Sequence, residues 1–371
     1  MPTLDQGGHR PFGVPAGRWT SSHGIWSSTA AAGAGRYAAR RRRLGHMPDV
    51  HDRVVALARR QDDMITRSQA RGLGLSDGAI AARRRAHGWH TPIRGTLVIP
   101  PVRDRVRAHA RAALAAAGGT VCLLTAARLH GLPGLPPQGT TEPVDVAFPG
   151  GAAFRGRRGC RRHCMELTPG ETTDIAGIKA TTVHRTLQDI ILRLDRAISV
   201  PMLDALLHRG WPNGHGACGA AMGGAVRPSS DFMALKEAVL RRNDAGEGPP
   251  GITRLWNLVD GRAGTVLESR VRLALVEAGL EPEAVRWAPA GPATGRAGER
   301  VHLAWPSAGL AVQTYELAAP PARERQTAHR SRLQAQLADL GMSTLWLTWS
   351  DLHDPDHLVS RIRHRLASSG R

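Results

Sequence analysis

The sequence is poor in cysteine, and its few cysteines exclude two kinds of structure. Four cysteines among 371 residues are too few and too irregularly spaced for the disulfide framework of a small secreted domain. Cys160 and Cys164 are separated by three residues, with His163 between them, whereas zinc sites usually use two pairs with other spacings. No second pair follows, so we expect reduced thiols and no bound metal.

Long apolar runs are also missing. No stretch approaches the roughly 20 apolar residues that a membrane helix needs, and no apolar run follows the basic residues at 40–43, as it would in a signal peptide. These absences predict a cytoplasmic protein without membrane spans. Residues 1–49 are rich in Gly, Ser and Ala without apolar periodicity. This composition predicts a disordered leader, or a start codon assigned too early with Met47 as the true start.

Lysine is nearly absent, but positive charge is abundant. Only Lys179 and Lys236 are lysines, so 48 of the 50 basic residues are arginine, and the formal net charge is +19. Such an excess favours a polyanionic partner, because phosphate contacts release condensed counterions. We expect nucleic acid as the partner, and the alternative is a basic surface that is merely well solvated.

The pattern of the remaining chain predicts an α+β protein of several domains. Residues 50–100 follow the order helix, helix, short turn, helix and β-hairpin, which is the order of a winged helix-turn-helix. Thr66 and Ser76 stand directly before two of the helices and are expected to cap them. The segment from Trp89 onward, with the apolar run at 96–99, predicts the hairpin.

The third helix of this unit is the candidate DNA-reading element. It carries Arg83, Arg84 and Arg85, and basic or polar side chains stand near it. Arginine reaches phosphates and also grips the guanine edge with its fork of donors. The plainer interpretation is a solvated basic helix face. The full set of expected DNA-contacting residues is Ser76, Arg83, Arg84, Arg85, His87, His90 and Arg94.

Residues 101–210 predict an α+β middle domain. A helix is expected at 106–117 and a strand at 144–148, followed by an arginine-rich, hairpin-like segment at 155–162. His130 stands at a helix end, where a histidine more often caps or packs than acts as a base. Residues 211–250 predict a linker that contains one helix.

Several segments between about residues 50 and 210 resemble a known family. The segment Gln61–Ala70, together with the stretch from Leu75 to Trp89 and Gly95, resembles the N-terminal winged-helix domain of AbiEi-type antitoxins. Residues 125–133 and 181–189 look like the signature of the domain that follows it in many actinobacterial relatives. Arg84 departs from the pattern, because such proteins place an apolar residue there.

The resemblance implies a type IV toxin–antitoxin role, in which the antitoxin binds double-stranded DNA and represses its own promoter. It also implies a nucleotidyltransferase-like toxin as a protein partner. Two-fold symmetric operators favour a homodimer. The alternatives are neutralisation of that toxin by protein contact alone, and a DNA endonuclease activity in the C-terminal domain.

Residues 251–371 predict a C-terminal domain with the order helix, strand, strand, helix, strand, helix. This order, with Leu267–Arg270 at its start, looks like the restriction-endonuclease-like fold related to very-short-patch repair nucleases. Those nucleases use carboxylates to hold Mg²⁺ and a metal-activated water. Mg²⁺ would be a cofactor here only if the domain were active.

The expected carboxylates of that fold are replaced in this chain. The family pattern places an aspartate on the first strand and a glutamate on the second, and the matching positions hold His302 and Gln313. Alternation predicts that both face one side of the sheet. Glu268 survives, either as a vestigial metal ligand or as the partner of Arg272 in an i,i+4 ion pair. We expect a nuclease-like domain that has lost its catalytic residues and its metal.

Overall fold

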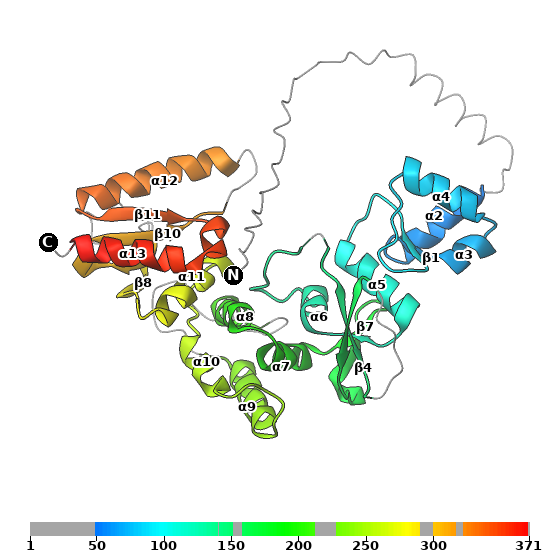
Figure 1. The fold of residues 1–371 in the computed structure, drawn as a ribbon, viewed down its shortest axis with the longest axis horizontal. Helices are drawn as coiled ribbons and strands as arrows, with labels where there is room; N and C mark the ends of the chain where they lie inside the picture. The colour runs from blue at the N-terminus through cyan, green and yellow to red at the C-terminus, as the bar shows by residue number, and fades with distance from the viewer. Residues whose placement is uncertain are drawn as a thin grey trace, which may run out of the picture. The chain divides into compact units, whose positions relative to one another are not determined.

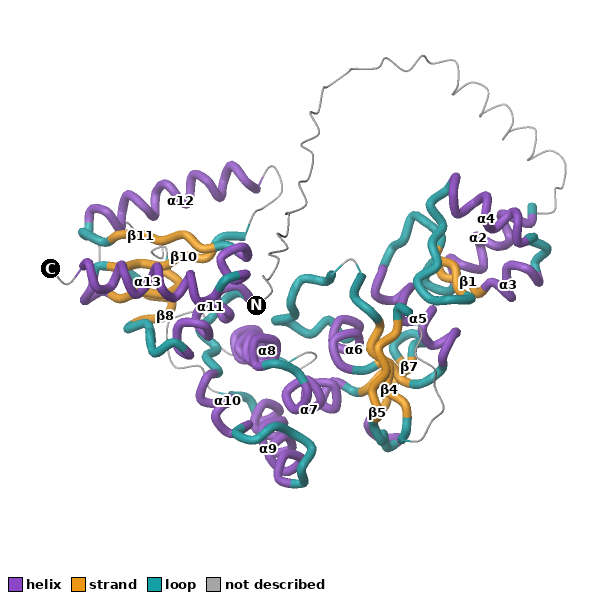
Figure 2. The backbone as a smooth tube through the Cα atoms, in the orientation of Figure 1, coloured by secondary structure: helices purple, strands orange, loops and turns teal. Residues whose placement is uncertain are grey.

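The computed structural model describes residues 49–139, 141–150, 158–211, 228–289, 300–316 and 322–369 (Figure 1). The chain separates into Met1–Asp49 and a second unit, Val50–Arg371, and the leader expected at 1–49 lies outside the described residues except for Asp49. Figure 2 shows helices and strands mixed along the second unit. The expected α+β class is therefore confirmed at this level. Within the described part of the chain, no helix combines the length and apolarity that a membrane crossing requires.

The N-terminal part of this unit contains three short helices and a two-stranded sheet. In chain order the elements are α2 (Val50–Arg60), β1 (Met64–Thr66), α3 (Arg67–Gly72), α4 (Asp77–Ala86) and β2 (Thr96–Val98). They close over a small core, because one face of each helix is apolar. Its buried members include Val54, Ile65, Ile80, Trp89 and Leu97.

The expected caps are confirmed. The Thr66 hydroxyl accepts a hydrogen bond from the Gln69 amide (3.1 Å), and the Gln69 side chain accepts one from the Thr66 amide (2.9 Å). This reciprocal arrangement is a capping box. The Ser76 hydroxyl accepts a hydrogen bond from the Ala79 amide (3.2 Å) and starts α4.

The expected hairpin after Trp89 is wrong in its main pairing. β2 pairs antiparallel with β1, which the sequence did not predict, and only a single bridge joins His90 to Val98. All three residues of β2 are buried, so the strand needs a partner that belongs to the core. The three-residue strand Met64–Thr66 is too short to show an alternating pattern, which is why it escaped prediction.

The middle part is built on a five-stranded sheet in the order β5-β4-β3-β7-β6. Its elements are α5 (Arg105–Ala117), β3 (Thr120–Val121), α6 (Leu123–Leu129), β4 (Val144–Phe148), β5 (Cys160–Cys164), β6 (Thr172–Asp174), β7 (Lys179–Thr181), α7 (Val183–Arg193) and α8 (Arg196–Arg209). The helix and strand expected near 106–117 and 144–148 are confirmed. The hairpin-like segment is not: β5 runs parallel to β4, and a parallel pair needs a longer return than a tight turn gives. Residues 151–157, with two of its arginines, lie outside the described residues.

The helix expected within a linker belongs to a core. This helix, α9 (Ser230–Asp244), and the following α10 (Ile252–Leu258) contribute Phe232, Leu235 and Trp256 to the same buried cluster as α7 and α8. Only residues 212–227 of the expected linker lie outside the described part. The apolar face of α9 therefore extends the middle domain beyond its expected end at residue 210.

The C-terminal part is a four-stranded sheet with helices on both faces. Its elements are α11 (Val266–Glu277), β8 (Ala284–Trp287), β9 (Val301–Trp305), β10 (Leu310–Thr314), α12 (Ala322–Asp339), β11 (Ser343–Leu347) and α13 (Pro355–Ser369). The sheet order is β11-β10-β9-β8, with β10 and β11 parallel and the other pairs antiparallel. The expected order is confirmed apart from β8, a four-residue edge strand that was not predicted.

Each face of this sheet has its own cluster of apolar side chains. Leu303 and Val312 pack with α11 and α13, whereas Ala304 and Ala311 pack with Leu333 of α12. Alternation along a strand explains this division. The crossover from β10 through α12 to the parallel β11 places α12 on the second face.

Candidate functional site

The exposed face of α4 offers two free arginines. Arg84 and Arg85 are exposed and, among the described residues, form no hydrogen bond or ion pair. Ile80, one turn earlier, is buried in the core and fixes the rotation of the helix. Arg84 also lines a small surface hollow with Thr91 and Gly95. The guanidinium groups of Arg84 and Arg85 are therefore available to bind an anionic partner.

Arg83 is used differently from its two neighbours. Its Nε donates to Nδ1 of His51 on α2 (3.0 Å), and its guanidinium carbon lies 5.9 Å from the centre of the Trp89 ring. The rings of His51 and Trp89 are stacked as well, with centroids 5.9 Å apart. Arg83 therefore ties α4 to the core, and the structure does not bring it together with the free pair.

Of the remaining residues expected to contact DNA, some are exposed and others make internal contacts. His87 and Arg94 are exposed, and the Ser76 hydroxyl is occupied by its cap. His90 faces α5, where its Nε2 lies 3.4 Å from Nε2 of His109. Burial lowers the pKa of His109 to about 4, with the charges of Arg105 and His90 adding to the effect. His90 thus belongs to a contact with the middle domain.

Two arginines of α3 were not expected from the sequence. Arg67 and Arg71 are exposed, and Nε of Arg67 donates to the carboxylate of Asp77 at the start of α4 (3.0 Å). The acidic residue at the start of α4 is therefore already neutralised by α3. The signal in the sequence that could have identified Arg67 and Arg71 is their place in the helix that Thr66 caps.

The Gln61–Ala70 motif contains a clamp that holds the N-terminal elements on α5. Asp62 and Asp63 both adopt left-handed backbone angles, with φ of 53° and 65°, which short polar side chains tolerate best. Asp62 pairs with Arg107 (2.9 Å) and Arg111 (2.6 Å) of α5. Asp63 pairs with Arg59 (2.5 Å) and Arg103 (3.2 Å). We name these two aspartates and four arginines the aspartate clamp.

The clamp keeps its aspartates charged. Burial raises the pKa of Asp62, but its hydrogen bonds to Arg107 and Arg111 outweigh burial, so the net pKa is lowered. The pKa of Asp63 is lowered in the same way by the Arg103 amide and the Arg59 side chain. Four of the arginines that contribute to the net charge are therefore committed to internal pairs.

A second group of polar residues surrounds a cavity in the C-terminal part. The cavity has a volume of about 430 Å³ and lies between α11, the β8–β9 edge and the end of α8. We name it the Glu268 cavity. The lining residues are His208, Gly264, Thr265, Glu268, Arg286, Arg300 and His302. Thus two of the three vestigial candidates meet here, and Gln313 does not.

Gln313 is held between two strands. Its side-chain oxygen accepts a hydrogen bond from the His302 amide (3.1 Å), and its side-chain nitrogen donates to the Arg300 carbonyl (3.2 Å). The amide thereby replaces backbone pairing where β9 and β10 separate. The expected shared face for His302 and Gln313 is wrong, because alternation breaks at this point. Val301 packs toward α12, whereas Leu303 packs toward α11.

The expected ion pair between Glu268 and Arg272 is also wrong. Arg272 donates instead to Asp204 of α8 (3.1 Å), which also accepts hydrogen bonds from Ser269 (2.7 Å) and the Asp260 amide (2.6 Å). All these side chains except that of Asp260 are buried. Burial raises the pKa of Asp204 to about 6, against the opposite effect of Arg272. This pair fastens α8 to α11.

Glu268 is almost fully buried, with 1% of its surface exposed. Its Oε2 accepts a hydrogen bond from the Gly264 amide (2.9 Å), but among the described residues its Oε1 has no hydrogen-bond partner. Burial raises the pKa of Glu268 to about 7, although the Gly264 amide and the charge of Arg286 favour the ionised form. Burial likewise lowers the pKa of His302 to about 4, helped by the charge of Arg286.

The Glu268 cavity does not fit a magnesium ion. Mg²⁺ needs several hard oxygen ligands, usually including more than one carboxylate or phosphate. Of the lining residues that the structure describes, Glu268 supplies the one carboxylate, and two arginines oppose a cation. Within the described ranges, no group of three or more His, Cys, Asp or Glu residues is arranged to hold a metal.

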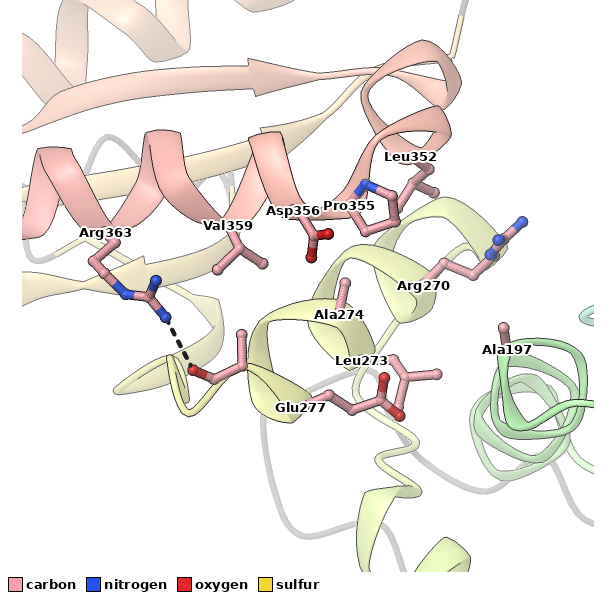
Figure 3. A pocket seen from close by; sticks show the side chains of 11 residues that line it. Ala197, Arg270, Leu273, Ala274, Glu277, Leu352, Pro355, Asp356, Val359 and Arg363 are labelled. Carbon is pink, nitrogen blue, oxygen red and sulfur yellow. Dashed lines mark hydrogen bonds between the residues drawn. The ribbon is translucent and has the colours of Figure 1, made fainter. Parts of the chain in front are cut away.

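A larger hollow of about 480 Å³ lies between α11 and α13 (Figure 3). Leu273, Ala274 and Val359 supply an apolar floor, and Arg363 donates to the Ala278 carbonyl (3.4 Å) at one end. Glu277 at its rim is paired with Arg196 of α8. Arg270 and Asp356 line the hollow as well, and the guanidinium carbon of Arg270 lies 5.8 Å from the centre of the Trp349 ring. The hollow therefore combines an apolar floor with charged side chains around it.

His130 and the cysteine region provide no further site. Nε2 of His130 lies 2.7 Å from the Thr181 carbonyl oxygen, so the side chain joins α6 to β7. His163 contacts the buried carboxylate of Asp145 (2.9 Å). Both histidines are thus engaged in structural hydrogen bonds.

Comparison with known proteins shows no family for this chain. No family model and no curated protein matches it. Among solved structures, the chain is similar to the crystal structure of the RV2827C protein from Mycobacterium tuberculosis, with 18% sequence identity and a TM-score of 0.35. That similarity covers 65% of this chain and 84% of the other. A similarity at this level carries no argument about fold or function.

Proposed function

We propose that this protein is a DNA-binding transcriptional regulator whose N-terminal part is a winged helix and whose α4 reads the major groove. The observation that carries the proposal is the pair Arg84 and Arg85, exposed and without internal partners on a helix that Ser76 caps. Arginines of this kind reach both phosphates and guanine edges. The net charge of +19 supports a polyanionic partner.

The distribution of charge on the N-terminal part supports the same proposal. Residues 50–100 contain nine arginines and four aspartates. Asp62 and Asp63 are held by the aspartate clamp, and Asp77 is paired with Arg67. Three of the four aspartates are therefore neutralised internally. Arg71, Arg84, Arg85 and Arg94 remain exposed, with no hydrogen bond or ion pair among the described residues, as a basic set on α3, α4 and the turn before β2.

For the C-terminal part we propose a restriction-endonuclease-like fold that acts as a non-catalytic scaffold. Its three antiparallel strands, crossover helix and parallel strand are compatible with that fold. The described lining of the Glu268 cavity holds no second carboxylate, and Gln313 joins two strands. Metal-dependent hydrolysis needs ligands that this lining does not supply.

The proposal is tested by a mobility-shift assay with the full chain and its own upstream DNA. The double variant Arg84→Ala/Arg85→Ala should bind at least ~10-fold more weakly, since each lost arginine contact contributes about 1–3 kcal/mol. Arg254→Ala, which removes an exposed arginine of α10, is the matched control and should bind as the unaltered protein does. Equal binding by all three proteins would contradict the proposal. Plasmid nicking with Mg²⁺ that Glu268→Ala abolishes would overturn the assignment of a scaffold.

A further inference from the structure

The Glu268 cavity lies where the sheet is distorted. Arg286 interrupts β8 with a left-handed backbone angle, φ of 53°, which costs a residue with a Cβ of order 1 kcal/mol or more. The regular pairing of β8 with β9 skips this residue and His302, which stands opposite. Gln313 bridges the gap on the other side of β9. The distortion brings side chains of both strands into the cavity.

The charge of the cavity favours an anion. Arg286 and Arg300 line it and, among the described residues, neither forms an ion pair. The Arg286 guanidinium reaches Gly264 so closely that a Cβ at that position would lie 2.8 Å from its Nη1. Among the described lining residues Glu268 is the one acidic residue, and His208 and His302 add two imidazoles. Positive groups therefore outnumber the single carboxyl group.

The buried carboxyl group of Glu268 adds a second, independent feature. Its Oε1 is buried and has no hydrogen-bond partner in the described part of the chain, and it lies on a side chain that lines the cavity. A buried acceptor without a partner costs about 1–3 kcal/mol, so such atoms usually receive a donor from a ligand or water. A hydroxyl group of a ligand is a suitable donor.

We propose that the Glu268 cavity binds a small phosphomonoester that carries hydroxyl groups. Its phosphate lies on Arg286 and Arg300, and one of its hydroxyl groups donates to Oε1 of Glu268. A volume of about 430 Å³ is within the usual range of small-molecule sites and exceeds the needs of phosphate alone. One guanidinium group can occupy both oxygens of a carboxylate, whereas the three terminal oxygens of a phosphomonoester can accept hydrogen bonds from two guanidinium groups.

This site is separate from the proposed DNA-reading helix. None of its lining residues belongs to α3, α4 or the turn before β2. Each of the two proposals can therefore be refuted without refuting the other. Arg84→Ala/Arg85→Ala should leave phosphomonoester binding unchanged.

The first test is calorimetric titration of the full chain with ribose 5-phosphate, ethyl phosphate and ribose. Ribose 5-phosphate should bind most tightly, ethyl phosphate more weakly because it lacks hydroxyl groups, and ribose not at all. Arg286→Ala and Arg300→Ala should each weaken binding of ribose 5-phosphate by at least ~10-fold, as expected for a charge-assisted hydrogen bond. Arg254→Ala should bind normally.

A second variant keeps every charge and shifts one side chain. Gly264→Ala places a methyl group against the Arg286 guanidinium, which is the flexible end of a side chain and can move aside. This variant should fold, as its melting temperature would show, and should bind ribose 5-phosphate several-fold more weakly. A folded Gly264→Ala protein with unchanged affinity, together with unchanged affinity in Arg286→Ala, would overturn the proposal.

The source of the phosphomonoester is decided by a comparison of oligonucleotides. A 5′-phosphorylated single strand that competes with ribose 5-phosphate, while its 5′-hydroxyl twin does not, would identify a DNA end as the ligand. Competition by neither strand would identify a free metabolite. Absence of binding by ribose 5-phosphate and ethyl phosphate at millimolar concentration, or Mn²⁺ binding that depends on Glu268, would refute the proposed site.

Discussion

At the scale of single residues, three consecutive arginines have different roles because a helix turns by about 100° per residue. Arg83 points toward His51 and Trp89, whereas Arg84 and Arg85 remain exposed. The sequence shows only a basic triplet. Which member packs inward depends on the rotation set by Ile80, and this is why the expected DNA contacts include one arginine that has a structural role.

Arg83→Ala is therefore expected to lower the free energy of unfolding by about 1–2 kcal/mol, through the lost hydrogen bond and the lost contact with an aromatic ring. Urea denaturation of the full chain measures the change. Arg85→Ala is the matched control and should change it by less than about 0.5 kcal/mol. Equal losses in the two variants would contradict the assigned roles.

His109 gives the contact between the N-terminal part and α5 a pH dependence. Its pKa is lowered from 6.5 to about 4 by burial, then by the charges of Arg105 and His90. Between these values the unfolded chain takes up a proton that the folded chain does not, so stability falls as the pH falls from about 6.5 toward 4. Above pH 6.5 this loss is absent.

The variant His109→Gln should therefore lose about 1–2 kcal/mol less than the unaltered protein between pH 7 and pH 5. Denaturation at both pH values measures the difference. His87→Gln replaces an exposed histidine and should behave like the unaltered protein. An identical loss in His109→Gln would show that the histidine is protonated without cost.

At the scale of helices and strands, the sequence predicts most helices and misses the shortest strands. Caps at Thr66 and Ser76 and the apolar spacing along α11 are local signals, and the structure confirms them. β1 and β8 carry too few residues to show alternation. The parallel pairing of β5 with β4 depends on partners far along the chain, which a local pattern does not encode.

The candidate site was predictable in the same partial way. Glu268 and His302 were singled out by the resemblance to very-short-patch repair nucleases, and they do line one cavity. Arg286 and Arg300 were not, because they belong to an edge strand and a strand end whose places in the sheet are tertiary. The break in alternation that turns Gln313 away from the cavity also has no local signature.

The helices α8 and α11 are fastened by a buried ion pair, Asp204 with Arg272. Asp204→Ala should lower the free energy of unfolding by about 3–5 kcal/mol, because it leaves a buried guanidinium without its counter-charge. The matched control is Glu237→Ala, which breaks an exposed pair with Arg241 on α9 and should cost less than about 1 kcal/mol. Chemical denaturation measures both changes, and a loss below 1 kcal/mol in Asp204→Ala would contradict the importance of the pair.

At the scale of the whole molecule, several of the arginines behind the net charge of +19 form internal ion pairs. The aspartate clamp and the pairs of Arg185 and Arg242 with Asp189 consume arginines internally. The arginines that remain outside decide how the protein responds to salt. Any DNA affinity should therefore fall steeply with ionic strength.

The proposed reading helix makes this expectation quantitative. Each phosphate contact adds about 0.9 to the slope of log K against log salt. Arg84→Ala/Arg85→Ala should reduce that slope by up to about 2, as measured by fluorescence anisotropy between roughly 50 and 200 mM salt. An unchanged slope would assign the phosphate contacts to other parts of the chain.

The hydrogen bonds of the Gln313 side chain also limit which substitutions could create a metal site in this domain. Its amide accepts from one backbone group and donates to another, and an ionised carboxylate can only accept. Gln313→Glu would set a negative oxygen against the Arg300 carbonyl, so the strands would have to separate further before a metal ion could enter. A single substitution at Gln313 is therefore insufficient to create a metal site here, because the paired strands would have to change together.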